Sequence, residues 1–339
     1  MRTASLIVLA AILVSAGPAF AQSCQLPSLA DTAKLVPVAG SDLMTVPVAV
    51  NGKPKQFLLD LGGGPTEVTP ATAAELGLPQ NAQASGGMIQ SGSMGDLGSN
   101  PGSLNIQSPV YNVNGSQNPD LIRPHVRVGA FTIGNATARN LQFIVSSGNG
   151  KTPPYDGLLT SDFFKQYDLE VNFAGREINY LTATKCTDPE QAVFWSHAVV
   201  AAVPITLVNG KFQMPVTIDG HALTGTIDTT ATKTVMRREI AEQQFGLKPG
   251  SPDLAAEPGN ADIFKHVFRQ VAFGGVMVQN AAVLIPANSA SGNGGTVLGS
   301  RAQPADALIP ELTIGMDVLS HLHLYVVPGQ GKMFVTAAE

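Results

Sequence analysis

The feature that most constrains the fold of this chain is an internal repeat. Residues 47–60 (PVAVNGKPKQFLLD) align without a gap with residues 215–228 (PVTIDGHALTGTID), at a constant offset of 168 positions. One inserted residue later, Gly77 of the first copy aligns with Gly246 of the second. Such a repeat predicts that one supersecondary unit is built twice and that the two units pack against each other.

Each copy predicts a hairpin that ends on an aspartate. Asn51 in the first copy and Asp219 in the second each precede a glycine between two apolar runs, which is the strongest short-range hairpin signal. The second strand of the hairpin ends at Asp60 or Asp228, and a loop of small residues and a short helix follow. If the units pack about a pseudo-twofold axis, both strand ends meet at that axis.

Two carboxyl groups a few ångströms apart cannot both ionise cheaply, so they share one proton and can hold a water between them. With Asp60 and Asp228 placed in this way, the sequence resembles the aspartic peptidases, in particular the retropepsin-like branch, whose signature is Asp-Thr/Ser-Gly. The shared proton is that family's established chemistry. The resemblance implies a mainly β fold of two homologous retropepsin-like β-barrel lobes, related by a pseudo-twofold with a cleft between them.

A second pair of matching segments extends the resemblance. Residues 311–319 match residues 156–164 at an offset of 155. They resemble the family's second signature, an apolar pair and a glycine leading into a helix. The resemblance implies two catalytic residues, Asp60 and Asp228, and four that support them, Gly62, Thr229, Ile314 and Gly315.

Three positions depart from the family pattern. Leu61 stands where a hydroxyl is expected, and Thr160 and Thr230 stand where glycines are expected. A β-branched residue is poorly suited to a tight turn if its φ is positive, and each supporting donor that is lost costs up to hundreds-fold in rate. Two functions therefore stay open: an aspartic-type endopeptidase, or a degenerate, non-catalytic relative that binds peptide or protein segments in the same cleft.

The organisation predicted for the chain is a lead-in at residues 22–42, lobe one at 43–183, a linker at 184–202 and lobe two at 203–337. Residues 81–118 are rich in Gly, Ser, Asn and Gln. They stand where the family has a mobile flap over the cleft, and a plain surface loop is the alternative.

The N-terminus is typical of an exported protein. An apolar run from Ala4 to Ala16 follows Arg2, and the sequence Ala19-Phe20-Ala21 is a small-x-small cleavage site. We expect residues 1–21 to be a signal peptide cut after Ala21, and the mature chain to be periplasmic or secreted. The run is short for a bilayer span, and we expect no membrane span in the mature form.

The two cysteines, Cys24 and Cys186, form an even number in an oxidising compartment. The hypothesis is one disulfide that ties the mature N-terminus to the segment between the repeats, with two free thiols as the alternative.

Composition and resemblance together limit the partners. With 44% hydrophobic and only 13% charged residues the chain is not disordered, and a net charge of −5 gives no reason to expect nucleic acid. The resemblance implies a monomer that acts on an extended peptide or unfolded protein, with no cofactor and no metal.

Overall fold

The structure is a computed structural model. It describes residues 26–81, 124–146, 152–160, 167–183, 201–208, 211–287 and 310–338, together with Phe163, Val193 and Trp195. The described strands form three sheets, two of eight strands and one of six. The helices within the described residues are short: α1 (Pro70–Glu75), α4 (Arg238–Phe245), α5 (Met316–Leu319) and the 3-10 turn η3 (Pro328–Gln330).

The first eight-stranded sheet belongs to lobe one. Its spatial order is β2 (Val36–Pro37), β3 (Met44–Val50), β4 (Lys53–Asp60), β9 (Gly157–Thr160), β5 (Glu67–Val68), β8 (Ala136–Val145), β7 (His125–Ile133) and β6 (Gln80–Asn81). The second sheet, in lobe two, has the order β13 (Thr206–Val208), β14 (Lys211–Ile218), β15 (His221–Ile227), β20 (Leu312–Ile314), β16 (Val235–Met236), β19 (Val276–Pro286), β18 (Asn260–Phe273) and β17 (Ala255–Glu257).

The two orders correspond strand for strand. Even the additional pairings agree, since β3 also pairs with β7 and β14 with β18. In both lobes the strand that leads to the aspartate pairs in parallel with the strand of the second signature, β4 with β9 and β15 with β20. The predicted fold class, mainly β with two homologous lobes, is confirmed.

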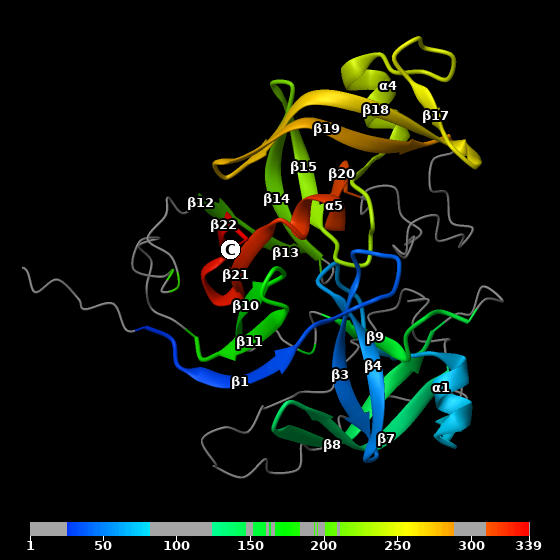
Figure 1. The fold of residues 1–339 in the computed structure, drawn as a ribbon, viewed down its shortest axis with the longest axis vertical. Helices are drawn as coiled ribbons and strands as arrows, with labels where there is room; N and C mark the ends of the chain where they lie inside the picture. The colour runs from blue at the N-terminus through cyan, green and yellow to red at the C-terminus, as the bar shows by residue number, and fades with distance from the viewer. Residues whose placement is uncertain are drawn as a thin grey trace, which may run out of the picture.

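A six-stranded sheet joins the lobes. Its order is β1 (Leu29–Lys34), β11 (Glu177–Leu181), β10 (Asp168–Asn172), β21 (Leu322–Val327), β22 (Lys332–Ala337) and β12 (Ala201–Pro204). Each half is the same hairpin with one outer strand, and the halves meet at the antiparallel β10–β21 pair. The sheet therefore has a local pseudo-twofold at its centre, and in Figure 1 it lies between the two lobes.

The repeated hairpin turns form as their residues predict. Asn51 and Asp219 adopt the left-handed conformation, with φ of 50° and 45°, which Asn and Asp tolerate better than other non-glycine residues. Helix α1 begins as expected, because the Thr69 hydroxyl accepts a hydrogen bond from the Thr72 N–H at 3.2 Å and Pro70 occupies the first helical position.

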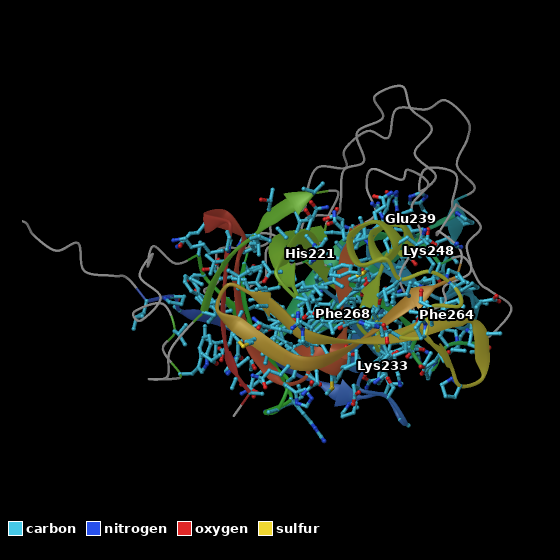
Figure 2. The ribbon with its side chains drawn as sticks, turned by 90° about the horizontal axis from the view of Figure 1, so that it is seen from above. His221, Lys233, Glu239, Lys248, Phe264 and Phe268 are labelled. Carbon is cyan, nitrogen blue, oxygen red and sulfur yellow. The ribbon has the colours of Figure 1, made fainter. Side chains whose placement is uncertain are left out.

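Each lobe has an aromatic centre. In lobe one, the ring of Phe131 lies 5.4 Å from Phe57 and 5.0 Å from Phe143, measured between centroids. In lobe two, the ring of Phe268 in β18, labelled in Figure 2, lies 4.9 Å from that of Phe245 in α4. These contacts pack β7 against β4 and β8 in lobe one, and α4 against β18 in lobe two.

The structure also contains strands that the sequence did not predict. β1 lies within the 22–42 lead-in, and β12 begins within the 184–202 linker. Residues 250–262 contain β17 and the first residues of β18. β10 and β11, which lie within the 43–183 range of lobe one, pair into the sheet between the lobes. The lobe boundaries at 43–183 and 203–337 stay predictions.

Two further predictions concern other parts of the chain. No helix within the described ranges is both long and apolar enough to cross a membrane. Residues 1–21, both cysteines and nearly all of residues 81–118 lie outside the described residues, so the signal peptide, the Cys24–Cys186 disulfide and the flap stay predictions.

Candidate active site

The two aspartates lie at equivalent places in the two lobes. Asp60 is the last residue of β4, and Asp228 directly follows β15. Both are buried, with 5% of Asp60 and 2% of Asp228 exposed. A buried carboxyl group is costly unless it is hydrogen-bonded, so the donors around each aspartate determine what the pair can do.

Thr229 fastens the aspartate loop of lobe two to that of lobe one. Its hydroxyl donates to the carbonyl oxygen of Leu59 at 2.6 Å and accepts from the N–H of Leu61 at 2.9 Å. Thr229 is 1% exposed, so both hydrogen bonds are shielded from water. They place the residue before Asp60 and the residue after it in direct contact with the residue after Asp228.

Leu61 contributes packing at the place where the family has a hydroxyl. Its side chain is fully buried and belongs to the main hydrophobic core. Thr229 therefore supplies one hydroxyl to the link between the two loops, and Leu61 supplies apolar contact where the aspartic peptidases that the sequence resembles have a second hydroxyl.

Gly62 brings the two aspartates together. Its N–H donates to Oδ1 of Asp60 at 2.8 Å. A Cβ atom added at Gly62 would lie 2.7 Å from Cγ of Asp228 and 2.9 Å from its Oδ1. By standard geometry this Cβ position is about 2.5 Å from the Gly62 nitrogen. Asp60 Oδ1 on one side and Cγ of Asp228 on the other therefore lie at most about 8 Å apart.

The need for glycine at position 62 comes from this close approach. Gly63 and Gly64 have φ of 91° and 108°, but Gly62 is not among the residues with positive φ. Its backbone is therefore open to other residues, and the carboxyl group of Asp228 leaves no room for a side chain.

Thr230, the counterpart of Gly62, does not disturb the loop of lobe two. It is not among the residues with positive φ, so the condition under which its β-branch would be unsuitable does not hold. Its N–H donates to Oδ1 of Asp228 at 2.9 Å, and its hydroxyl donates to the same oxygen at 2.7 Å. The expectation that Thr230 is a lost support is wrong.

The second signature supports Asp228 from the neighbouring strand. The carbonyl oxygen of Ile314 accepts from the N–H of Asp228 at 3.0 Å. The N–H of Gly315 donates to the hydroxyl of Thr234 at 3.2 Å. A Cβ at Gly315 would lie 2.4 Å from the carbonyl oxygen of Lys233, so lobe two requires a glycine there.

Lobe one accommodates Thr160 at the equivalent place. The Thr160 N–H donates to the Thr66 hydroxyl at 3.4 Å, and the two hydroxyls are 3.2 Å apart. The glycines with positive φ at 63 and 64 give the lobe-one loop a different path from its counterpart, where Ala231 and Thr232 have no positive φ. This difference explains how a side chain fits in lobe one. The sequence could have identified Thr66, because it aligns with Thr234 at the repeat's offset of 168.

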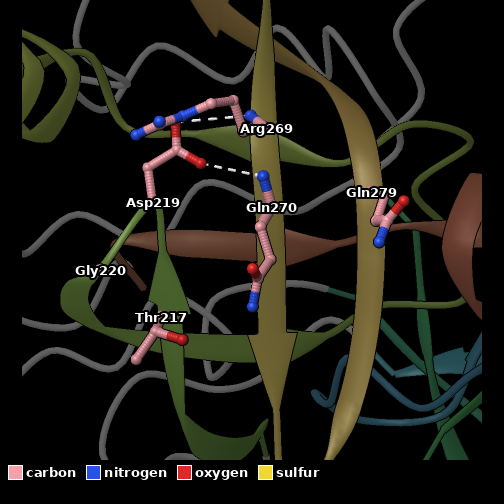
Figure 3. A pocket seen from close by; sticks show the side chains of 6 residues that line it. All are labelled: Thr217, Asp219, Gly220, Arg269, Gln270 and Gln279. Atoms are coloured by element: carbon pink, nitrogen blue, oxygen red, sulfur yellow. Dashed lines mark hydrogen bonds and ion pairs between the residues drawn. The ribbon is translucent and has the colours of Figure 1, made fainter.

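A surface hollow in lobe two lies away from the aspartates. It is lined by Thr217, Asp219, Gly220, Arg269, Gln270 and Gln279 (Figure 3). These residues surround the β14–β15 turn, at the opposite end of β15 from Asp228, about 20 Å along the strand. The Asp219 carboxylate accepts from the Gln270 N–H at 2.9 Å, which fastens the turn to β18. Asp219 is a turn residue, as the sequence indicates.

The arrangement supports proton transfer by a pair of carboxyl groups. In the described part of the chain, no three His, Cys, Asp or Glu residues are grouped to hold a metal ion. Asp60 and Asp228 lie at one interface, each with a backbone N–H on its Oδ1. Such a pair can act on a water and on a carbonyl group together.

No protein-family model matches the sequence, and no curated protein matches it. Solved structures with a similar fold include the basic 7S globulin from soybean, at 14% identity and a TM-score of 0.43 over 91% of this chain and 95% of that one. Conglutin gamma, a basic 7S globulin from lupine seeds, shows 12% identity and a TM-score of 0.46 over the same shares. A retropepsin-like aspartic protease from Rickettsia conorii shows 13% identity and a TM-score of 0.29, over 40% of this chain and 90% of that one. Function does not follow from similarity at this level, so it has to be argued from the contacts of this chain.

Proposed function

We propose that the protein is an exported aspartic-type endopeptidase that hydrolyses peptide bonds with a water held by Asp60 and Asp228. The observation that carries this proposal is the contact of Gly62 with Asp228. The residue that donates to one aspartate has no room for a side chain because the other aspartate lies against it.

The reaction needs only the two carboxyl groups and water. One carboxylate accepts a proton from the water as the water oxygen attacks the peptide carbonyl carbon, and the other carboxyl group donates its proton to the carbonyl oxygen. Breakdown of the tetrahedral intermediate breaks the C–N bond, and a proton passes to the leaving amine. The products are an acid and an amine, with no covalent intermediate on the protein.

The proposed substrate is an extended segment of peptide or unfolded protein. Two β lobes whose aspartates meet at their interface would bind it in a cleft between them, with main-chain hydrogen bonds providing affinity that is largely independent of sequence. The protein would act as a monomer, because both aspartates come from one chain.

A second function is favoured by one observation. Leu61 supplies no hydroxyl to the contact between the loops, whereas Thr229 supplies one. If the loss of one of the two hydroxyls leaves the carboxyl groups too mobile for catalysis, the protein would bind extended peptides without cleaving them.

The test compares wild type with Asp60→Asn and Asp228→Asn. Each variant is incubated with an unstructured protein at acidic and near-neutral pH, and cleavage is followed by mass spectrometry. The peptidase proposal expects cleavage by wild type and at least about a thousandfold loss in both variants, because neither carboxyl group can replace the other. Binding without cleavage by all three proteins would establish the binding function instead.

Export is tested on the protein recovered from the periplasm or the medium of cells that express the full chain. Its N-terminal residue should be Gln22, and its mass should rise by two hydrogen atoms on reduction if Cys24 and Cys186 are paired. A protein that retains residues 1–21 would contradict the signal peptide, and a protein in which both thiols are alkylated without reductant would contradict the disulfide.

A further inference from the structure

Thr230 contacts Asp228 twice. Its backbone N–H and its hydroxyl both donate to Oδ1 of that carboxyl group, at 2.9 Å and 2.7 Å. Both residues are buried, with 5% of Thr230 and 2% of Asp228 exposed, so water competes little for this oxygen. Two donors from one residue restrict both the position and the rotation of the carboxyl group.

The equivalent position in lobe one cannot do this. Gly62 donates its backbone N–H to Asp60 Oδ1 at 2.8 Å, but it has no side chain. The asymmetry is also steric. A Cβ at Gly62 would lie 2.7 Å from Asp228 Cγ, about 1 Å closer than carbon atoms normally pack. Thr230 has a Cβ, so Asp60 cannot lie against Thr230 as Asp228 lies against Gly62.

The pair of carboxyl groups therefore departs from its twofold symmetry. Thr230 holds Asp228 Oδ1 with two hydrogen bonds from one residue, whereas the glycine at the equivalent position of lobe one has no side chain with which to hold Asp60.

We propose that Thr230 is a positioning residue, whose hydroxyl fixes the Asp228 carboxyl group in the orientation that the reaction needs. This inference rests on the proposed peptidase function and gives it a direction, since Asp60 and Asp228 are then not interchangeable. It also assigns a role to a residue that departs from the family's sequence pattern.

The test uses two matched variants. Thr230→Val removes the hydroxyl but keeps the β-branch and the backbone N–H, and Thr230→Ser keeps the hydroxyl. A hydrogen bond to an ionised group contributes enough for about a 10- to 100-fold change. Thr230→Val should lower kcat by that factor with KM unchanged. Thr230→Ser should stay within about threefold of wild type.

A binding measurement separates this inference from the peptidase proposal. Two peptides are compared by calorimetry, one with a secondary alcohol in place of the scissile carbonyl and one with a methylene group there. The alcohol imitates the tetrahedral state, so a working pair should bind it more tightly. In Thr230→Val the preference for the alcohol should fall about 10- to 100-fold, while affinity for the methylene peptide should not change.

The outcomes are distinct. If wild type neither cleaves nor prefers the alcohol, the carboxyl pair holds no water, and both proposals are refuted. If wild type prefers the alcohol and Thr230→Val keeps that preference and its kcat, the hydroxyl only shapes the loop and the positioning role is refuted. If Thr230→Val melts well below wild type, Thr230→Ala replaces it, since it removes the hydroxyl without adding a buried methyl group in its place.

Discussion

Adding one methyl group at Gly62 tests whether the two lobes bring their carboxyl groups together. In Gly62→Ala, the new Cβ would lie 2.7, 2.9 and 3.0 Å from the three carboxyl atoms of Asp228. Non-bonded carbon atoms normally approach to about 3.5–4.0 Å, so the carboxyl group has to retreat by roughly 1 Å. The backbone at position 62 has no positive φ, so the substitution itself adds no backbone strain.

The expected cost has two parts. Overpacking a buried contact costs about 1–3 kcal/mol of stability, which corresponds to a decrease in Tm of several degrees for a chain of this size. Displacing a reacting group by about 1 Å costs roughly 100-fold in rate. Gly62→Ala should therefore lose about 100-fold in kcat while remaining folded, because the contact involves a single side chain.

The matched control is Gly329→Ala. Gly329 also lacks a positive φ, and a Cβ added there meets no atom within 4 Å. Its kcat and Tm should equal those of wild type, as measured by peptide cleavage and differential scanning calorimetry. If Gly62→Ala matched Gly329→Ala in both measurements, Asp228 would not lie against the lobe-one loop, and the paired site would be refuted.

Three further predictions concern the contacts that hold the lobes in place. Thr229→Val removes both hydrogen bonds to the lobe-one loop and should cost about 1–3 kcal/mol in urea unfolding, and Thr229→Ser should restore most of it. Asp31→Ala removes the β1 carboxylate that accepts hydrogen bonds from the N–H groups of Asn135 and Ala136 at the β7–β8 turn. Amide hydrogen exchange should therefore become faster in β1 than in the rest of the six-stranded sheet. Burial alone would lower the pKa of Lys55, but its hydrogen bonds to Glu75 and its attraction to Asp156 outweigh burial and raise that pKa above the ordinary 10.5. Wild type should therefore lose stability relative to Lys55→Met as the pH rises above about 10.5, since a raised pKa in the folded state stabilises only while the amine is charged; equal pH profiles would contradict this.

The repeat made most of the two lobes predictable from sequence. The hairpin turns at Asn51 and Asp219 and the short helix that follows each loop depend on a few neighbouring residues, and the structure confirms them. The signal is local because a turn residue with positive φ or a capping hydroxyl acts on the backbone within three residues of itself. Finding such signals twice, in the same order, predicts the same sheet twice.

The sheet between the lobes was not predictable in this way. β1 pairs with β11 and β12 pairs with β22, each across more than 120 positions in the chain. β12 is only four residues long, and its sequence, AAVP, has no alternating pattern. Such strands form because the edge of a partner strand offers unpaired backbone N–H and C=O groups, and that partner is far away in the sequence.

The candidate site shows why comparing a motif position by position misjudges the number of hydrogen-bond donors that reach an aspartate. A motif records which residue type stands at each position, whereas a carboxyl group responds to any donor that reaches it. Thr230 breaks the glycine pattern, yet it adds a donor to Asp228. Thr160 also breaks the pattern, and the lobe-one loop accommodates it through Gly63 and Gly64.

The two aspartate loops complement each other, and this complementarity decides how the departures combine. Lobe two supplies the side-chain donors, since Thr229 binds the lobe-one backbone and Thr230 binds Asp228. Lobe one supplies space, because Gly62 has no side chain where Asp228 lies against it. A second threonine opposite Thr229 would have to replace Leu61, which is fully buried in the core, and would leave a cavity there. The departures from the family pattern are therefore coupled across the interface, and their costs do not add as independent losses.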